Sequence, residues 1–329
     1  MGNVKGCVVV TGATGFLGGH LIRRLAKNKF NVVATGRDAG KISALSSEGF
    51  VTFRHDLTKP IPDNADLPRI DTIIHCAALS AAVGPRRAFM EANVFATKNL
   101  VDFAKRHDVM RLIYISSPTV YFQMADNLLV KEDAPLPTPI NHYAMTKRMA
   151  EEIVLEAKKL NPIILRPRGI YGPGDETLLP TLLVAAKRPF PKLRGGIASI
   201  DLTYIDDVVE AIISAFRAGP ETNSNIFNIS GGESIPIQEI VNKVCKAHGI
   251  EARWRNLPLK PLVVLAKVAE RAVDMFPMAP TPRITPYLLG LFAFQQSLDL
   301  SKAESMLKWK PTVSFESGLG KVLKAEKSS

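Results

Sequence analysis

The chain has 329 residues, of which 46% are hydrophobic and 22% are charged, and both values are typical of soluble globular proteins. Its formal charge of +11 is carried by scattered lysines and arginines, whereas a nucleic-acid-binding surface needs a cluster. Three cysteines without close spacing argue against disulfides and a metal site, and no apolar run reaches the roughly 18 residues that span a membrane. We therefore expect a cytoplasmic protein that binds neither metal nor nucleic acid.

The first predicted element is a buried strand over residues 7–10, followed by a glycine-rich turn and a helix. Thr11, Gly12, Gly15 and Gly18 form the pattern T-G-x-x-G-x-x-G, and leucines at helical spacing follow it. Glycines let the backbone approach a pyrophosphate, and the free N–H groups at a helix start favour its negative charge. The order of strand, turn and helix predicts a dinucleotide site, with a purely structural turn as the alternative.

Strand-like and helical patterns then alternate along the first half of the chain. The apolar runs of strand length cover residues 31–36, 50–56, 71–78, 111–117 and 162–167. Such alternation predicts an α/β fold with a doubly wound parallel sheet and helices on both faces. Because ligands bind at the carboxyl ends of parallel strands, the residues that follow each strand are the candidates for chemistry.

The end of the second predicted strand bears on the choice of cofactor. A fold of this kind that prefers NAD usually carries an acidic residue there, which binds the ribose 2′-hydroxyl. This chain has Gly36 and then Arg37, and a guanidinium can bind a 2′-phosphate. We therefore predict NADP(H), with NAD(H) as the second possibility; a solvent-exposed arginine without a ligand is the alternative.

Three further strand ends carry polar or small residues. Asp56 either accepts a hydrogen bond from the adenine or caps the next turn, and the sequence favours neither. His75 is expected to be a structural residue rather than a catalytic one. Ala77 and Ala78 have small side chains, against which a flat cofactor could lie.

The stretch HYAMTKRMAEE places Tyr143 and Lys147 four residues apart at the start of a predicted helix. This spacing puts both side chains on one helical face. A positive charge about 4 Å from a phenolate can lower its pKa by up to about three units. We therefore expect Lys147 to lower the pKa of Tyr143 and to make it an acid/base near neutrality, with plain helix packing as the alternative.

Ten short motifs in order resemble the extended short-chain dehydrogenase/reductases over nearly the whole chain. They are TGATGFLG, HDL, HCAA, ANVFATKNL, YISSPTVYF, EDAPLPTP, YAMTK, LRPRGIYGPGD, TYIDDVV and FNISGGE. The resemblance implies that Tyr143 is the catalytic acid/base, that Lys147 assists it and binds the nicotinamide ribose, and that Ser117 binds the substrate oxygen. It also implies a supporting role for Asn93.

Further site residues follow from the glycine turn, the strand ends and the resemblance together. The predicted cofactor-binding residues are Thr11, Gly12, Thr14, Gly15, Phe16, Leu17, Gly18, Arg37, Asp56, Leu57, Ala77, Ala78, Ser116, Tyr143, Lys147, Pro167 and Ile170. The predicted substrate-binding residues are Ser80, Tyr171, Tyr204 and Arg283.

The resemblance also implies two domains and a dimer. The cofactor domain is expected over residues 1–171 with 203–230, and a smaller mixed α/β substrate domain over 172–202 with 231–329. Relatives commonly form homodimers by pairing two long helices, here predicted over 88–107 and 142–160, into a four-helix bundle.

The expected activity is the interconversion of a secondary alcohol and a ketone or aldehyde on an apolar substrate, such as a 3-keto acid or a sterol-like compound. The strand end SSPTVYF and a helical apolar segment in the second half are most similar to the 3β-hydroxysteroid dehydrogenase-like branch, which includes reductases of 2-alkyl-3-keto acids. One alternative is a nucleotide-sugar epimerase or dehydratase with the same Ser-Tyr-Lys site, whose substrate phosphates could bind to Arg194, Arg253, Arg255 and Arg283. A second alternative is a non-catalytic NADPH-binding sensor.

The apolar segment itself has three interpretations. Residues 262–276 form an amphipathic pattern, and the aromatic run 284–294 follows. The segment can pack in the core, cover an apolar pocket or lie on a membrane surface. The sequence favours core packing.

Overall fold

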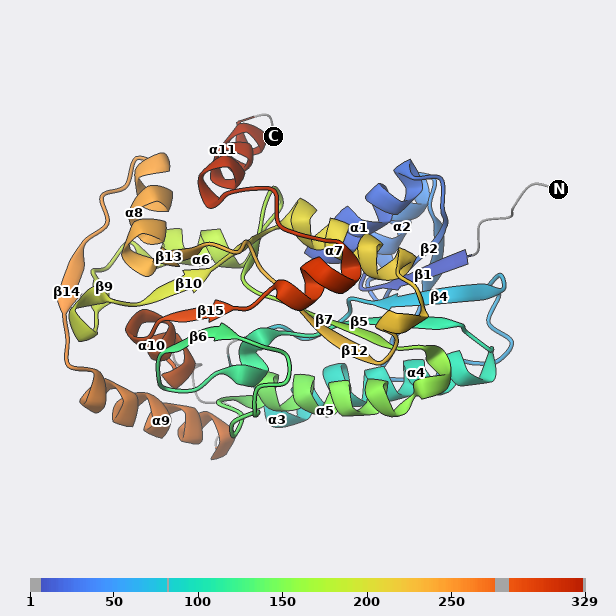
Figure 1. Ribbon diagram of the computed structural model, residues 1–329, viewed down its shortest axis with the longest axis horizontal. Helices are drawn as coiled ribbons and strands as arrows, with labels where there is room; N and C mark the ends of the chain where they lie inside the picture. The colour runs from blue at the N-terminus through green and yellow to red at the C-terminus, as the bar shows by residue number, and fades with distance from the viewer. Residues whose placement is uncertain (1–6, 82, 276–283, 328–329) are drawn as a thin grey trace.

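A seven-stranded parallel sheet forms the core of the right-hand half of the molecule as seen in Figure 1, in the order β12-β7-β5-β4-β1-β2-β3. The structure, a computed structural model, describes residues 7–81, 83–275 and 284–327. The strands are β1 (Cys7–Thr11), β2 (Asn31–Gly36), β3 (Val51–Arg54), β4 (Ile70–His75), β5 (Arg111–Ile115), β7 (Ile163–Pro167) and β12 (Asn225–Ile229). From β1 the chain adds β2 and β3 on one side, and it then adds β4, β5, β7 and β12 on the other side. The order of the strands thus reverses between β1 and β4, and folds of this kind bind ligands at such a point. The predicted Rossmann-type sheet is confirmed.

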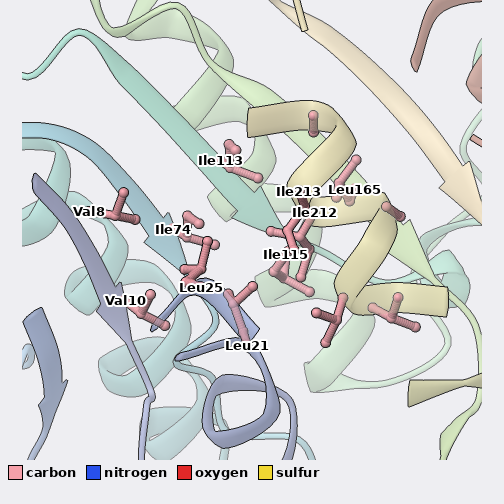
Figure 2. Packing of buried hydrophobic residues seen from close by; sticks show 14 of the residues in the cluster. Val8, Val10, Leu21, Leu25, Ile74, Ile113, Ile115, Leu165, Ile212 and Ile213 are labelled. Atoms are coloured by element: carbon pink, nitrogen blue, oxygen red, sulfur yellow. The ribbon is translucent and has the colours of Figure 1, made fainter. Parts of the chain in front are cut away.

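Helices cover both faces of this sheet because side chains along each strand alternate between two apolar clusters. Val8 and Val10 join the cluster beneath α1 (Phe16–Lys27), α2 (Ala39–Ser47) and α7 (Ile205–Arg217), and Figure 2 shows part of this packing. Cys7 and Val9 join the opposite cluster, beneath α4 (Ala96–Arg106) and α5 (His142–Glu156). Burying each aliphatic side chain contributes about 1.5–3 kcal/mol.

The second half of the chain adds smaller sheets and helices. A four-stranded sheet runs in the order β13-β10-β15-β6, and two pairs of short strands, β11-β8 and β14-β9, lie beside it. The strands are β6 (Asn127–Val130), β8 (Ile170–Tyr171), β9 (Phe190–Lys192), β10 (Ser199–Asp201), β11 (Thr203–Tyr204), β13 (Ser234–Pro236), β14 (Trp254–Asn256) and β15 (Gln296–Leu298). The helices are α6 (Leu178–Ala185), α8 (Ile237–Ala247), α9 (Leu259–Met275), α10 (Pro286–Ala293) and α11 (Phe315–Glu326). The expected small mixed α/β part is therefore present.

The two long predicted helices lie side by side, as expected, but each is interrupted (Figure 1). The helix predicted over 88–107 consists of α3 (Arg86–Phe89), a π-helical turn (Met90–Phe95) and α4. The helix predicted over 142–160 ends at Glu156 and is followed by a 3₁₀ turn. A π-helical turn inside an α-helix often marks a functional site, and this one contains Asn93. The other short helices are Pro118–Tyr121, Lys158–Leu160, Arg194–Gly196, Pro220–Thr222 and the π-helical Ala303–Leu307.

Helix α9 has three different faces. Its Ala266 is buried in an apolar cluster, as core packing predicts. Its Lys267 and Arg271 line a cavity of about 660 Å³ whose other wall comes from α3 and the start of α5, so the helix also covers a pocket. Three neighbouring side chains are 61–66% exposed, namely Val264, Leu265 and Val268. Contact with a membrane surface stays a prediction, and no helix in the described ranges is long and apolar enough to span one.

Candidate active site

The glycine turn after β1 has the tight geometry that a bound pyrophosphate requires. Gly12 has a φ of 68°, and a Cβ there would lie 2.8 Å from the backbone of Ala77. A Cβ on Gly18 would lie 2.1 Å from the carbonyl oxygen of Gly12. Only glycine fits either position, so the turn brings the start of α1 against the ends of β1 and β4.

The N-terminus of α1 is open to an anion. Gly15 precedes the helix and provides no side-chain cap, and the first turn holds no acidic residue. The N–H groups of the first turn therefore keep their donor capacity, and the helix dipole favours negative charge at this end. These features fit the diphosphate of a dinucleotide.

Two basic residues gather at the adjacent strand ends. Arg37 is exposed just beyond β2, and Arg54, at the end of β3, donates through Nε to the Arg37 carbonyl at 3.3 Å. Thr14 lies against Gly36, where a Cβ would approach its hydroxyl to 2.9 Å. Asp56 accepts from the Thr58 N–H at 3.1 Å, a bond that lowers the pKa of Asp56, and the charge of Arg37 lowers it further. Asp56 therefore caps a turn beside an arginine.

His75 is a structural residue, as expected. Its Nδ1 lies 2.6 Å from the Thr11 hydroxyl, and its Nε2 lies 3.0 Å from the Thr97 hydroxyl. Thr97 donates to the Asn93 carbonyl, so we assign the ring proton to Nε2. Burial, with a smaller contribution from Lys147, lowers the pKa of His75 to about 3 and keeps the ring neutral. Thr11, a predicted cofactor ligand, also accepts from the Ala77 N–H and joins β1 to β4.

The two serines after β5 differ in their surroundings. Ser117 begins the 3₁₀ helix Pro118–Tyr121 and accepts hydrogen bonds from the N–H and the hydroxyl of Thr119. The Ser116 hydroxyl is buried and has no hydrogen-bond partner among the described residues. Buried polar groups without partners are rare and point to a missing ligand or water.

Tyr143 lies in the first turn of α5, where Asn141 caps the helix by accepting from the Ala144 N–H at 2.9 Å. The side chains of Ser80 and Ser117 lie near its hydroxyl. Burial raises the pKa of Tyr143 above its ordinary value of 10, and the two serine hydroxyls oppose the rise. The serines and the tyrosine are therefore together at one point of the sheet edge.

Lys147 is 1% exposed, and its Nζ donates to the Ile115 carbonyl at 2.6 Å and lies 4.3 Å from the centre of the Tyr114 ring. Burial lowers the pKa of Lys147 to about 7, while the carboxylate of Glu151 raises it. The pKa of Tyr143 rises because burial outweighs the opposing effect of the serine hydroxyls, and the Lys147 ammonium is directed at a backbone carbonyl. Our expectation that Lys147 lowers the pKa of Tyr143 is therefore wrong.

Asn93 connects three parts of the site. Its amide donates to the Thr146 hydroxyl at 3.0 Å, and its side-chain oxygen accepts from the Leu79 N–H at 2.7 Å. The π-helical turn thus holds both α5 and the loop that carries Ser80 in place.

Comparison with known proteins places these features in a family. Residues 8–230 match the sequence model of the NAD dependent epimerase/dehydratase family. The chain belongs to this family.

Members that are similar over nearly the whole chain include two oxidoreductases. The chain is 31% identical to a 2-alkyl-3-oxoalkanoate reductase of Stenotrophomonas maltophilia, covering 95% of this chain and 97% of that protein. It is 29% identical to a decarboxylating sterol-4-alpha-carboxylate 3-dehydrogenase of Candida albicans, covering 96% of each. The structure of UDP-glucuronic acid 4-epimerase from Bacillus cereus in complex with NAD is 25% identical, with a TM-score of 0.76 and coverage of 98% and 99%. The chain is thus an NAD(P)-dependent enzyme of the extended short-chain dehydrogenase/reductase type, in its 3β-hydroxysteroid dehydrogenase-like branch.

Within this family fold, two predicted substrate residues lie in the core instead of at the site. Tyr171 is buried, donates to the Phe315 carbonyl and contacts the ring of Tyr204, which is also buried. Pro167 ends β7, and Ile170 begins the short strand β8. Arg283, the fourth substrate candidate, lies outside the described residues.

Sequence reasoning missed three residues near the site. Phe122 ends the 3₁₀ helix that starts at Ser117, and its ring lies edge-on to Tyr287 of α10 at 4.8 Å. Gly290 permits this approach, since a Cβ there would lie 2.3 Å from Phe122 Cζ. Arg168 follows β7 at the same sheet edge. The only signal for Phe122, Arg168 and Tyr287 was their place in the segments YISSPTVYF, LRPRGIYGPGD and ITPYLLGLFAF, where no local spacing distinguishes them.

Replacing Tyr143 by Phe removes the hydroxyl but keeps the ring. We predict that turnover in Tyr143→Phe falls by at least about 100-fold, the usual size of a general acid/base contribution. Initial rates with NADPH test this, and an unchanged melting temperature with unchanged cofactor binding is the control. Near-normal turnover would contradict the role of Tyr143.

Proposed function

We propose that the protein is an NADP(H)-dependent oxidoreductase that interconverts a secondary alcohol and a ketone on an apolar substrate, such as a 2-alkyl-3-oxo acid or a sterol-like β-oxo acid. The observation that carries this proposal is that Ser117 and Ser80 lie near the Tyr143 hydroxyl, one helical turn from the buried Lys147. The names of the two similar oxidoreductases support the substrate class.

In the direction of reduction, each residue acts where charge develops. The Ser117 hydroxyl donates to the substrate carbonyl oxygen and stabilises the growing negative charge. The Tyr143 hydroxyl delivers the proton to the same oxygen. Lys147, one helical turn away, is held by the Ile115 carbonyl and binds the nicotinamide ribose rather than lowering the pKa of Tyr143. The nicotinamide, when bound, supplies or accepts the hydride.

The cofactor is held by the glycine turn and by the strand ends beside it. We propose that the first turn of α1 binds the diphosphate, that Ser116 and Lys147 contact the nicotinamide side, and that Asp56, Leu57 and Ala77 lie along the adenosine. Arg37, with Arg54 beside it, is the candidate for a 2′-phosphate, which is why we propose NADP(H) over NAD(H).

A screen of NADPH and NADH consumption across 3-oxo acids, steroid ketones, simple aldehydes and nucleotide sugars tests this proposal. We expect the highest kcat/KM with NADPH and a 3-oxo acid. In Arg37→Ala, the NADPH-to-NADH ratio should fall at least about tenfold, since hydrogen bonds to a charged group contribute about 1.5–3 kcal/mol. Arg23→Ala, which removes an exposed arginine paired with Glu48, is the control. An unchanged ratio in Arg37→Ala would contradict the cofactor assignment.

The second candidate function is a nucleotide-sugar epimerase, favoured by the similarity to the Bacillus cereus structure. Against it, two of the four arginines proposed to bind the phosphates are bound to other groups. Arg194 pairs with Asp126 at 2.8 Å, and Arg253 donates to the Lys187 carbonyl at 3.2 Å. Tight co-purification of NAD, together with thermal stabilisation by nucleotide sugars alone, would reverse this ranking.

We also propose a homodimer formed through α4 and α5. Phe95, at the junction of the π-helical turn and α4, is 49% exposed, as expected for a residue covered by a partner. Light scattering should give twice the chain mass for the wild type, and Phe95→Arg should shift it towards the monomer. Val184→Arg, at an exposed apolar position on α6, should not. A monomeric wild type would contradict the dimer.

A further inference from the structure

Arg168 is the first residue after β7, and it lies beside Ser117, which follows the neighbouring strand β5. Strands β5 and β7 are parallel neighbours, with Ile115 opposite Leu165. Continuing this register places Ser117 opposite Pro167 and Arg168 one residue further along, on strands about 4.8 Å apart. The N–H of Arg168 donates to the Ile229 carbonyl at 2.9 Å. The arginine backbone is therefore fixed next to the proposed carbonyl site.

The Arg168 side chain is 7% exposed and is held in one orientation. Its Nε lies 3.0 Å from Asp201 Oδ1, and its Nη1 donates to Gln296 Oε1 at 2.9 Å. Asp201 accepts in turn from the Leu298 N–H at 3.0 Å. One carboxylate thus balances the guanidinium charge, and the four-stranded sheet fixes its position.

The hydrogen bonds of this cluster are incomplete. Arg168 Nε and Asp201 Oδ1 face each other at 3.0 Å as an ion pair without hydrogen-bond geometry, and Gln296 Nε2 is buried without a hydrogen bond to another described residue. A guanidinium has five N–H donors, and among the described residues Arg168 uses one of them in a hydrogen bond, from Nη1 to Gln296. The N–H groups of Nη2, which have no hydrogen-bond acceptor among the described residues, are the donors left for a ligand.

Tyr287 approaches the same place from α10. Its ring packs against Phe122, which ends the 3₁₀ helix started by Ser117. Burial raises the pKa of Tyr287 to about 12, the charge of Arg168 lowers it, and Tyr143 raises it. The charges of Arg168 and Tyr143 both act on Tyr287, whose ring is held by Phe122 at the end of the 3₁₀ helix that Ser117 begins. The Tyr287 hydroxyl stays protonated near neutrality and can donate a hydrogen bond.

We propose that Arg168 and Tyr287 form an anion subsite that binds a carboxylate of the substrate while its carbonyl faces Ser117 and Tyr143. An arginine edge and a phenol are donors that suit a carboxylate. A β-oxo acid carries its carboxylate two bonds from the ketone carbon. This separation suits Ser117 and Arg168, which follow the neighbouring strands β5 and β7. The inference rests on the proposed function and narrows it to acids, so that a neutral ketone of the same chain length binds without this contact.

Equilibrium binding separates this subsite from the reaction itself. Calorimetry with the NADP-loaded enzyme would compare the binding of octanoate, which has a carboxylate, with that of octanamide, which has a neutral amide in its place. Neither ligand has a ketone that the enzyme could reduce. The test variants are Tyr287→Phe and the double variant Arg168→Gln/Asp201→Asn, which removes both buried charges together. The control is Arg106→Gln/Asp63→Asn, which removes an exposed arginine–aspartate pair between the end of α4 and the segment that joins β3 to β4.

We expect octanoate to bind the double variant at least about tenfold more weakly than the wild type, on the usual scale for charge-assisted hydrogen bonds. Tyr287→Phe should show a smaller loss, and octanamide affinity should change by less than about twofold. Equal losses for both ligands, or no loss for octanoate, would overturn the subsite. If octanoate binding depends on Arg168 but no 3-oxo acid is reduced, the subsite stands and the proposed reaction fails.

Discussion

The buried ion pair between Glu151 and Arg166 fixes the helix on which the active site depends. The two side chains are 3% and 1% exposed, and they are joined by bonds of 2.8 and 2.5 Å. Arg166 lies on β7, whereas Glu151 lies on α5, one turn after Lys147 and two turns after Tyr143. The pair therefore sets the rotation of α5 that directs these two side chains at the sheet edge. Breaking such a pair costs about 3–5 kcal/mol, because it leaves a buried charge without a partner.

The fold could be predicted from the sequence where its signals are local. The glycine turn, the strand ends and the spacing of Tyr143 and Lys147 all lie within short windows, and the structure has them at the expected positions. The direction in which the pKa of Tyr143 shifts could not be predicted, because the spacing of residues along a helix does not show how deeply each side chain is buried. The pairing of Arg168 with Gln296 joins residues 128 positions apart, so no local pattern could indicate it.

The two candidate reactions share one site, and the second half of the chain distinguishes between them. A reductase and an epimerase of this family can both use Ser117 and Tyr143. What differs is the group that binds the rest of the substrate. The proposed donors Arg168 and Tyr287 suit a single carboxylate on an apolar compound better than a diphosphate. The cavity at the start of α5 is lined by Phe89 and Met145 on one side and by Lys267 and Arg271 on the other.

The most direct test of the reductase account follows the hydride. The enzyme would be incubated with a 2-alkyl-3-oxo acid and NADPH that carries deuterium at both C4 positions, and the product would be analysed by mass spectrometry. The account predicts one deuterium on the carbon of the former ketone, in equal amount to the NADP formed. A product without deuterium, or no net oxidation of the cofactor with any carbonyl compound, would contradict it.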